Sequence, residues 1–160
     1  MRYDAIIAGA GPAGSTATRI LAREGASVLL LDRARFPRDK PCGGGVTLRA
    51  AGCQDIDLSP VVERIVTGAR FSLRLGETFD RRYEEPLTYM TQRRRLDAFL
   101  VEAAVAAGAT FQDSEPVRAV EVSPNGGSGS GVTVRTERGS YSARALIGAD
   151  GANGVVGRDT

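Results

Sequence analysis

Runs of mainly apolar residues alternate along the chain with amphipathic and polar stretches. The runs predict strands covered on both faces, as in a parallel sheet, over residues 3–8, 27–31 and 145–149. Residues 12–24 and 93–107 have a helical period, and the apolar face of the second helix comprises Leu96, Phe99, Leu100, Ala103 and Ala104. Strands that alternate with helices favour an α/β fold with a parallel sheet.

Shorter elements are expected between these. Residues 65–90 alternate apolar and polar positions in short stretches, as β-strands do. A three-stranded antiparallel meander is expected over 117–143, with strands at 117–122, 131–137 and 140–143 and turns at 125–131 and Gly139. A strand at 109–112 and short helices at 46–51 and 60–64 complete the expected elements.

A glycine-rich turn, Gly-Ala-Gly-Pro-Ala-Gly over residues 9–14, joins the first strand to the first helix. In this pattern Gly9 permits a tight turn, Gly11 lets the backbone approach a pyrophosphate, and Gly14 lets the helix lie close to the strand. The anion would lie at the helix N-terminus, where a first-turn Pro12 loses no helical hydrogen bond. The pattern therefore predicts a dinucleotide site.

Asp32 follows the second strand, where an acidic side chain would hold the ribose hydroxyls of an adenosine. The alternative is an ordinary glycine turn in an α/β domain, with Asp32 solvated at the strand end.

Composition narrows the class of protein. The chain has 160 residues, enough for one domain with a core, and its net charge of +2 and 6% aromatic content do not favour a nucleic-acid surface. No apolar run approaches the ~20 residues that span a bilayer. The N-terminal run ends in a glycine turn and lacks a cleavage pattern, so we expect no signal peptide and a cytoplasmic protein.

Histidine is absent, which excludes Ser-His-Asp and Cys-His nucleophile systems. Cys42 and Cys53 lack the spacing of a zinc or CxxC site, so we expect no metal site and no structural disulfide. The chemistry is then expected to come from a bound cofactor.

Four stretches resemble a known family: residues 9–14, 36–46, 93–109 and 148–158. They are similar to FAD-dependent oxidoreductases of the glutathione-reductase-like, aromatic-hydroxylase type, and within that group to the geranylgeranyl reductase family. The resemblance implies FAD as cofactor and a Rossmann-like parallel sheet with an antiparallel three-stranded meander. It also implies that residues 65–90 are a β-rich piece of a substrate domain.

The resemblance assigns the other cofactor contacts. The expected set in the dinucleotide turn and the strand that follows it is Gly9, Gly11, Pro12, Ala13, Gly14, Asp32 and Arg33. The flavin would be lined by Cys42, Gly43, Gly44 and Gly45, the phosphates approached by Arg93, and the adenine met by the backbone of Val117. Asp150 and Gly151 would lie near the ribityl chain and the pyrophosphate. No catalytic residue is identified.

Several of these positions keep a second interpretation. Residues 33–45 are also consistent with a mobile surface loop, and Cys42 with either a reactive thiol or a small buried filler. Arg94 or Arg95 could replace Arg93, or the basic run could be a solvated helix start. Asp150 could be a turn aspartate at a strand end.

The chain also departs from the family pattern. Gly154 replaces the usual serine of the Asp-Gly motif. Family members are longer and carry a later Gly-Asp segment and most of the substrate domain, so we expect residues 1–160 to be an incomplete FAD-binding domain. Open sheet edges would then favour self-association.

The leading functional expectation is the FAD-binding part of an enzyme that reduces isoprenoid C=C bonds, with NAD(P)H or another reductant and a prenyl-lipid substrate. Peripheral membrane contact is compatible with such a substrate. The alternatives are a flavin-dependent monooxygenase or halogenase, and a nucleotide-binding fragment without catalysis.

Overall fold

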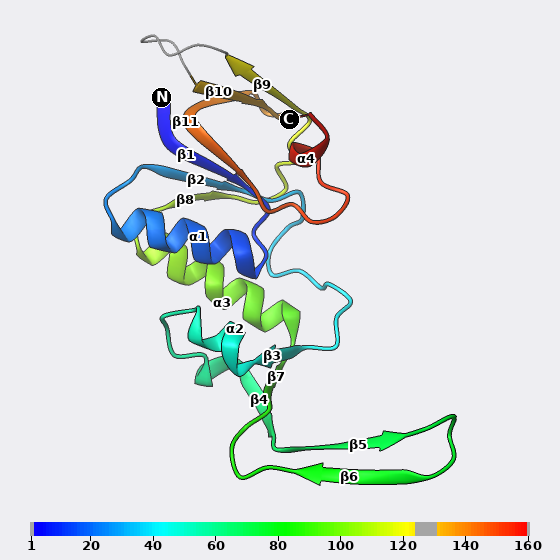
Figure 1. Ribbon diagram of the computed structural model, residues 1–160. Helices are drawn as coiled ribbons and strands as arrows, with labels where there is room; N and C mark the ends of the chain where they lie inside the picture. Colours follow the sequence, from blue (N-terminus) through cyan, green and yellow to red (C-terminus); the bar gives the residue numbers. More distant parts are fainter. Residues whose placement is uncertain (1, 124–130, 160) are drawn as a thin grey trace. The chain divides into compact units, whose positions relative to one another are not determined.

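The structure is a computed structural model that describes residues 2–123 and 131–159 (Figure 1). It divides into two compact units, one formed by residues 1–38 and 97–160 and the other by residues 39–96.

The first unit is built on a six-stranded sheet with the order β8-β2-β1-β11-β10-β9 (Figure 1). The strands are β8 (Thr110–Gln112), β2 (Val28–Leu31), β1 (Arg2–Ala8), β11 (Ser140–Gly148), β10 (Gly131–Arg135) and β9 (Ala119–Ser123). The first four are parallel to one another, and β10 is antiparallel to both of its neighbours. The expected parallel sheet with an antiparallel meander is confirmed. The expected turn over 125–131 lies outside the described residues except for Gly131.

Strand alternation divides the core between the two faces of this sheet. Ile7 and Leu30 face a cluster that includes Ala22 of α1 (Pro12–Arg23) and Val101 of α3 (Arg93–Ala106). Ile6 and Leu29 face the opposite side with Leu31, Val132, Val134 and Ala143. Both faces of β1 and β2 are therefore covered, which explains why their sequences are apolar runs without alternation.

The helices end close to their expected limits. After α1, Gly25 has φ +85° and its N–H donates to the Ala22 carbonyl at 3.0 Å, as expected for a left-handed cap. In α3 the expected Leu96, Leu100 and Ala104 are buried, whereas Phe99 and Ala103 are only partly buried. The buried face also contains Val101 and a carboxylate, Asp97.

One long strand takes the place of two expected ones. The runs at 140–143 and 145–149 belong to a single β11, which pairs antiparallel with β10 through Ser140–Ala143 and parallel with β1 through Ser142–Gly148. Arg144, which separates the apolar runs in the sequence, is exposed on this strand, and so are Ala145 and Ile147; the expectation that residues 145–149 are covered on both faces is wrong. The polar residue marks a solvent-exposed position within the strand and not the end of a strand.

The second unit is mostly antiparallel, as expected for residues 65–90. It contains the sheet β3-β7-β4, with β3 (Gly45–Thr47), β7 (Thr88–Thr91) and β4 (Val62–Val66), and a hairpin of β5 (Gly68–Ser72) and β6 (Thr78–Arg82). The expected helix at 46–51 is β3 followed by α2 (Leu48–Gly52), whose N-cap Thr47 accepts from the Ala50 N–H at 3.2 Å. The helix expected at 60–64 is wrong: a 3-10 turn, η1 (Ser59–Val61), leads into the strand β4.

A short helix, α4 (Val156–Asp159), ends the described chain. Among the described residues there is no helix with the length and apolar character needed to span a membrane.

Candidate functional site

The glycine turn lies between β1 and α1 and has almost no room for side chains. The Gly9 N–H donates to the Leu31 carbonyl at 2.7 Å, and Gly9 has φ +103°. A Cβ at Gly9 would overlap the Ala149 carbonyl oxygen, and one at Gly14 would overlap the Gly9 carbonyl oxygen. Two of the three glycines are thus required by close packing of the turn, the strands and the helix.

Gly11 is different. It is the N-cap of α1 with φ −77° and ψ −179°, an extended conformation that any residue adopts. The backbone therefore does not require glycine here, and the expectation that Gly11 leaves room for a ligand stays a prediction.

The N-terminus of α1 supplies amide donors beside this turn. Pro12 occupies the first turn and the Ser15 N–H donates to the Gly11 carbonyl at 2.9 Å, so the helical ladder begins at Ser15. The N–H groups of Ala13 and Gly14 precede the ladder, and the helix dipole places partial positive charge there. This arrangement suits a phosphate group.

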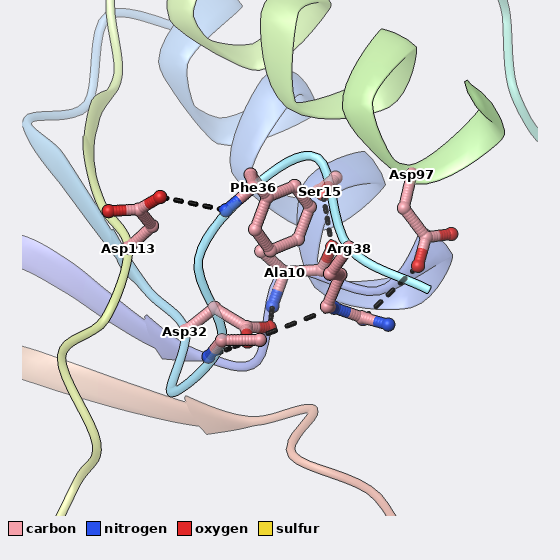
Figure 2. Close-up of polar contacts among 8 residues, drawn as sticks. Ala10, Ser15, Asp32, Phe36, Arg38, Asp97 and Asp113 are labelled. Atoms are coloured by element: carbon pink, nitrogen blue, oxygen red, sulfur yellow. Dashed lines mark hydrogen bonds and ion pairs between the residues drawn. The ribbon is translucent and has the colours of Figure 1, made fainter. Parts of the chain in front are cut away.

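Asp32, at the end of β2, holds the turn directly. The residue is only 7% exposed. Its Oδ2 accepts from the Ala10 N–H at 2.7 Å and its Oδ1 from the Ala34 N–H at 2.9 Å (Figure 2). The carboxylate is therefore an ordered part of the glycine turn and not a solvated strand end. Its contact with a ribose remains a prediction.

Every second residue of the segment after Asp32 makes a hydrogen bond or an ion pair with the rest of the first unit. Ala34 is held by Asp32, the Phe36 N–H donates to Asp113 Oδ2 at 2.8 Å, and Arg38 pairs with Asp97 (Figure 2). The intervening Arg33 is exposed. We call residues 33–38 the strap; these contacts do not fit the mobile-loop interpretation for this part of residues 33–45.

The Arg38 side chain lies between two carboxylates, those of Asp32 and Asp97 (Figure 2). Its Nη2 lies 3.1 Å from Asp97 Oδ2 and its Nε 3.9 Å from Asp32 Oδ1. Its guanidinium also lies over the Phe36 ring, 5.1 Å from the centroid.

Sequence reasoning missed Arg38, Asp97 and Asp113. Two signals were available: Asp97 shares its helix face with the buried Val101, and Asp113 follows β8 as Asp32 follows β2. The carboxyl ends of neighbouring parallel strands meet at one sheet edge, which is where ligands bind in such folds.

The Asp-Gly motif near the end of the chain meets the glycine turn. A Cβ at Gly9 would lie 2.8 Å from the Asp150 Cα, so residues 9 and 150 are neighbours. Asp150 Oδ2 accepts from the N–H groups of Val155 at 2.7 Å and Val156 at 3.2 Å, as a turn aspartate does. Gly151 has φ +87°. A contact of Asp150 or Gly151 with the cofactor stays a prediction.

The position of the missing serine lies against the Asp150 side chain. A Cβ at Gly154 would overlap the Asp150 carboxylate, so a side chain at residue 154 requires that carboxylate to turn away.

Val117 is only partly buried. It packs against the cluster on the sheet face opposite α1, just before β9. The structure leaves its expected backbone contact with adenine untested.

The residues expected at the flavin belong to the second unit. Gly44 has φ +74°, and a Cβ there would overlap the Thr91 carbonyl oxygen, while the Thr91 N–H donates to the Gly44 carbonyl at 2.8 Å. Gly45 pairs with Met90 in the β3–β7 ladder, and Gly43 has open space around its Cα. Cys42 is exposed, which disagrees with a buried filler.

The three arginines at the start of α3 differ in their contacts. Arg94 pairs with Asp39 at 3.2 Å, and Arg95 pairs with Glu63 at 3.3 Å and donates to the Pro60 carbonyl at 2.8 Å. Both are engaged with their own unit. Arg93 is half-buried, and its approach to the phosphates stays a prediction.

The first unit therefore gathers the turn residues, Asp32, Asp150 and Gly151 at the carboxyl ends of β1, β2 and β11. A glycine-rich turn, the N–H groups that precede the helical ladder and a buried carboxylate fit the adenosine and diphosphate portion of a dinucleotide.

Comparison with known proteins extends this result. Residues 2–160 match the profile of a family described as "FAD binding domain". The chain is 38% identical over 161 residues to geranylgeranyl diphosphate reductase of Rhodobacter capsulatus, a match that covers 98% of this chain and 39% of that protein.

Solved structures show the same similarity. A geranylgeranyl bacteriochlorophyll reductase-like protein from Thermoplasma acidophilum superposes with a TM-score of 0.77 at 25% identity, over 94% of this chain and 39% of that chain. Halogenase PltM in complex with phloroglucinol and FAD superposes with a TM-score of 0.76 over 98% of this chain and 36% of its own, but its 21% identity shows the fold alone. The chain spans about two fifths of the length of these relatives.

Proposed function

The chain belongs to the family of FAD-binding domains, and from this premise we propose that its glycine turn holds the adenosine diphosphate half of FAD in a flavin-dependent oxidoreductase. The observation that carries the proposal is the position of Asp32. Its carboxylate binds the Ala10 N–H within the turn, so a ribose held by Asp32 would place its diphosphate at the N-terminus of α1.

The chain's own residues would bind and orient. The N–H groups of Ala13 and Gly14 donate to phosphate oxygens, and Gly11 leaves the approach open. Asp32 accepts from ribose hydroxyls, which fixes the direction in which the cofactor leaves the turn. FAD, when bound, supplies the redox chemistry as a hydride carrier.

For the reaction, we propose the reduction of isoprenoid C=C bonds. A hydride and a proton add across the double bond, and NAD(P)H or another reductant returns two electrons to the cofactor. Support comes from the reductase of Rhodobacter capsulatus, which is 38% identical to the chain, whereas halogenase PltM is 21% identical. An oxygen-activating monooxygenase or halogenase is the second candidate, because PltM shares the fold along 98% of the chain.

The binding proposal is tested by calorimetric titration of the purified chain with FAD, ADP and FMN. We expect FAD and ADP to bind weakly and FMN to bind less, because the diphosphate and adenosine contacts lie in this chain. Gly11→Val should weaken ADP binding at least tenfold by placing a side chain where the phosphates approach, with only a small decrease in the midpoint of thermal unfolding from the poorer N-cap.

Gly52→Val is the matched control, because Gly52 ends α2 with open space around it and needs no left-handed conformation. If Gly11→Val binds ADP as well as the original chain, the diphosphate assignment is wrong. If none of the three nucleotides binds, the domain is an inert module.

The reaction is tested on a longer protein that contains this domain. After reduction of its flavin, a prenyl substrate should gain two hydrogens for each double bond reduced, and oxygen uptake without substrate should be slow. Rapid oxygen uptake with a hydroxylated or halogenated product would support the second candidate.

A further inference from the structure

A largely buried chain of ion pairs connects α3 to the glycine turn. It consists of Asp97 on α3, Arg38 on the strap and Asp32 at the end of β2, and we call these residues the Arg38 triad (Figure 2). Asp97 has no exposed surface, and the side chain of Arg38 is 13% exposed. Asp32, the third member of the triad, accepts a hydrogen bond from the Ala10 N–H at 2.7 Å.

Different nitrogens of the Arg38 guanidinium face the two carboxylates. Nη2 makes a close ion pair with Asp97, and Nε faces Asp32 at 3.9 Å without a hydrogen-bond partner among the described residues. Arg38 therefore stabilises Asp32 by charge and not by a direct hydrogen bond. Two separate nitrogens of the planar guanidinium face the two carboxylates, whereas a lysine carries its charge on a single nitrogen.

Two ionised carboxylates in a buried region are unfavourable unless a cation lies between them. Without Arg38, Asp32 would lower its energy by turning toward water, and its two bonds to Ala10 and Ala34 would weaken.

We propose that Arg38, anchored by Asp97, is a positioning residue for the adenosine end of the cofactor site: it keeps the Asp32 side chain turned onto the glycine turn. The proposal rests on the proposed function, because Asp32 is taken to be the residue that meets the ribose. In this arrangement α3 supports the turn through Asp97, which is distant in sequence from both Arg38 and Asp32.

A purely structural role for Arg38 would have a different signature. The strap keeps other ties, since the Phe36 N–H binds Asp113 and the Phe36 ring contacts Phe111 at 5.2 Å in an edge-to-face arrangement. Loss of Arg38 should therefore loosen Asp32 and its two amides, and leave the Phe36 amide protected. If Arg38 only held the strap in place, all three amides would open together.

The test compares Arg38→Met with Arg35→Met, which removes an exposed arginine from the same strap. Amide hydrogen exchange is measured by NMR at Ala10, Ala34 and Phe36 in the free protein, and ADP affinity by calorimetry. For Arg38→Met we expect exchange at Ala10 and Ala34 to rise about tenfold, an unchanged rate at Phe36, and ADP affinity about tenfold lower. Arg35→Met should change none of these.

Asp97→Asn tests the anchor. Arg38 keeps its charge but loses its partner charge on α3, so exchange at Ala10 should rise by a smaller factor than in Arg38→Met. Arg38→Lys serves if Arg38→Met does not fold. The ammonium can remain with Asp97 but has no second nitrogen directed toward Asp32, so we again expect faster exchange at Ala10.

Unchanged exchange at Ala10 in the Arg38 variants would overturn the proposal, and so would equal opening of Ala10, Ala34 and Phe36. If the original chain fails to bind ADP, the proposed function fails, while the exchange rates still decide whether Arg38 positions Asp32.

Discussion

At the scale of single residues, the two packed glycines of the turn and the N-cap glycine serve different purposes. A Cβ at Gly14 has no space beside the Gly9 carbonyl, whereas Gly11 has a backbone conformation open to any residue. Close packing therefore requires Gly9 and Gly14, and a role in ligand binding is predicted for Gly11.

We predict that Gly14→Ala destabilises the chain by about 1–3 kcal/mol or prevents folding, because helix and turn must move apart to admit the methyl group. Gly11→Ala should stay within about 0.5 kcal/mol of the original chain. Urea unfolding followed by circular dichroism measures both. Equal stability of the two variants would contradict the packing described for Gly14.

Asp4 provides a prediction about pH. The backbone N–H and the hydroxyl of Ser27 both donate to Asp4 Oδ2 at 2.9 Å, and these bonds lower the pKa of Asp4 below its ordinary value. Because the folded pKa is lowered, the stabilisation is present above the unfolded pKa of about 3.9 and is lost as pH falls through the lower, folded value.

An NMR titration of the Asp4 carboxyl should therefore show a depressed pKa. In Ser27→Ala the pKa should rise only part of the way to the ordinary value, since the backbone donor, which has the larger effect, remains. A complete return to the ordinary pKa would show that the hydroxyl alone is responsible.

At the scale of elements, the meander is joined to the parallel sheet through a buried carboxylate. Glu115 precedes β9 and is fully buried, and its Oε2 lies 2.8 Å from the Nε of Arg138, in the turn between β10 and β11. The Glu115 N–H also donates to the Asp32 carbonyl at 2.8 Å. The path from β8 into β9 is thus fixed at both backbone and side chain.

We predict that Arg138→Met destabilises the chain by about 1–2 kcal/mol, because a buried carboxylate loses its cation. The effect should be smaller than the loss of a fully buried pair, since Arg138 is more than half exposed. The matched control is Arg118→Met, which removes an exposed pair with Glu137 on the same meander and should cost about 0–0.5 kcal/mol. Equal losses in urea unfolding would show that burial of Glu115 has no special effect.

At the scale of the whole molecule, apolar surface and open strand edges remain in both units. The hairpin of β5 and β6 carries a stacked pair, Phe71 and Phe79, and its turn exposes Leu73 and Leu75, the latter at 96%. The six-stranded sheet ends at β8 and β9. Surfaces of this kind favour contact between chains.

We predict concentration-dependent self-association of the chain, measured by sedimentation velocity. The double substitution Leu73→Glu with Leu75→Glu should reduce it several-fold, because it places charge on the exposed turn. Arg74→Glu is the control, because it replaces a positive by a negative side chain at the same turn, and so changes the net charge as much as the double substitution does, without removing an apolar side chain. A single monomeric species at all concentrations would contradict this prediction.

The order of strands and helices in the first unit was accessible from the sequence. Buried parallel strands are apolar on both faces, so β1 and β2 appear in the sequence as apolar runs. The tight turn between a strand and a helix requires closely spaced glycines, a pattern that can be recognised in the sequence. The same local physics accounts for the ends of α1 and α3. Local patterns failed where a neighbour decided the outcome: β11 is one strand because β1 and β10 pair with its two ends.

The candidate site divides in the same way. Gly9, Gly14 and Asp32 could be singled out because each has a local backbone or strand-end signature. Arg38 and Asp97 are separated by 59 residues (97 − 38) in the sequence, and their pairing exists only after α3 is packed on the sheet. Sequence alone determined where the glycine turn forms; tertiary structure decided which distant charges pair beside it, because electrostatic partners are chosen by distance in space.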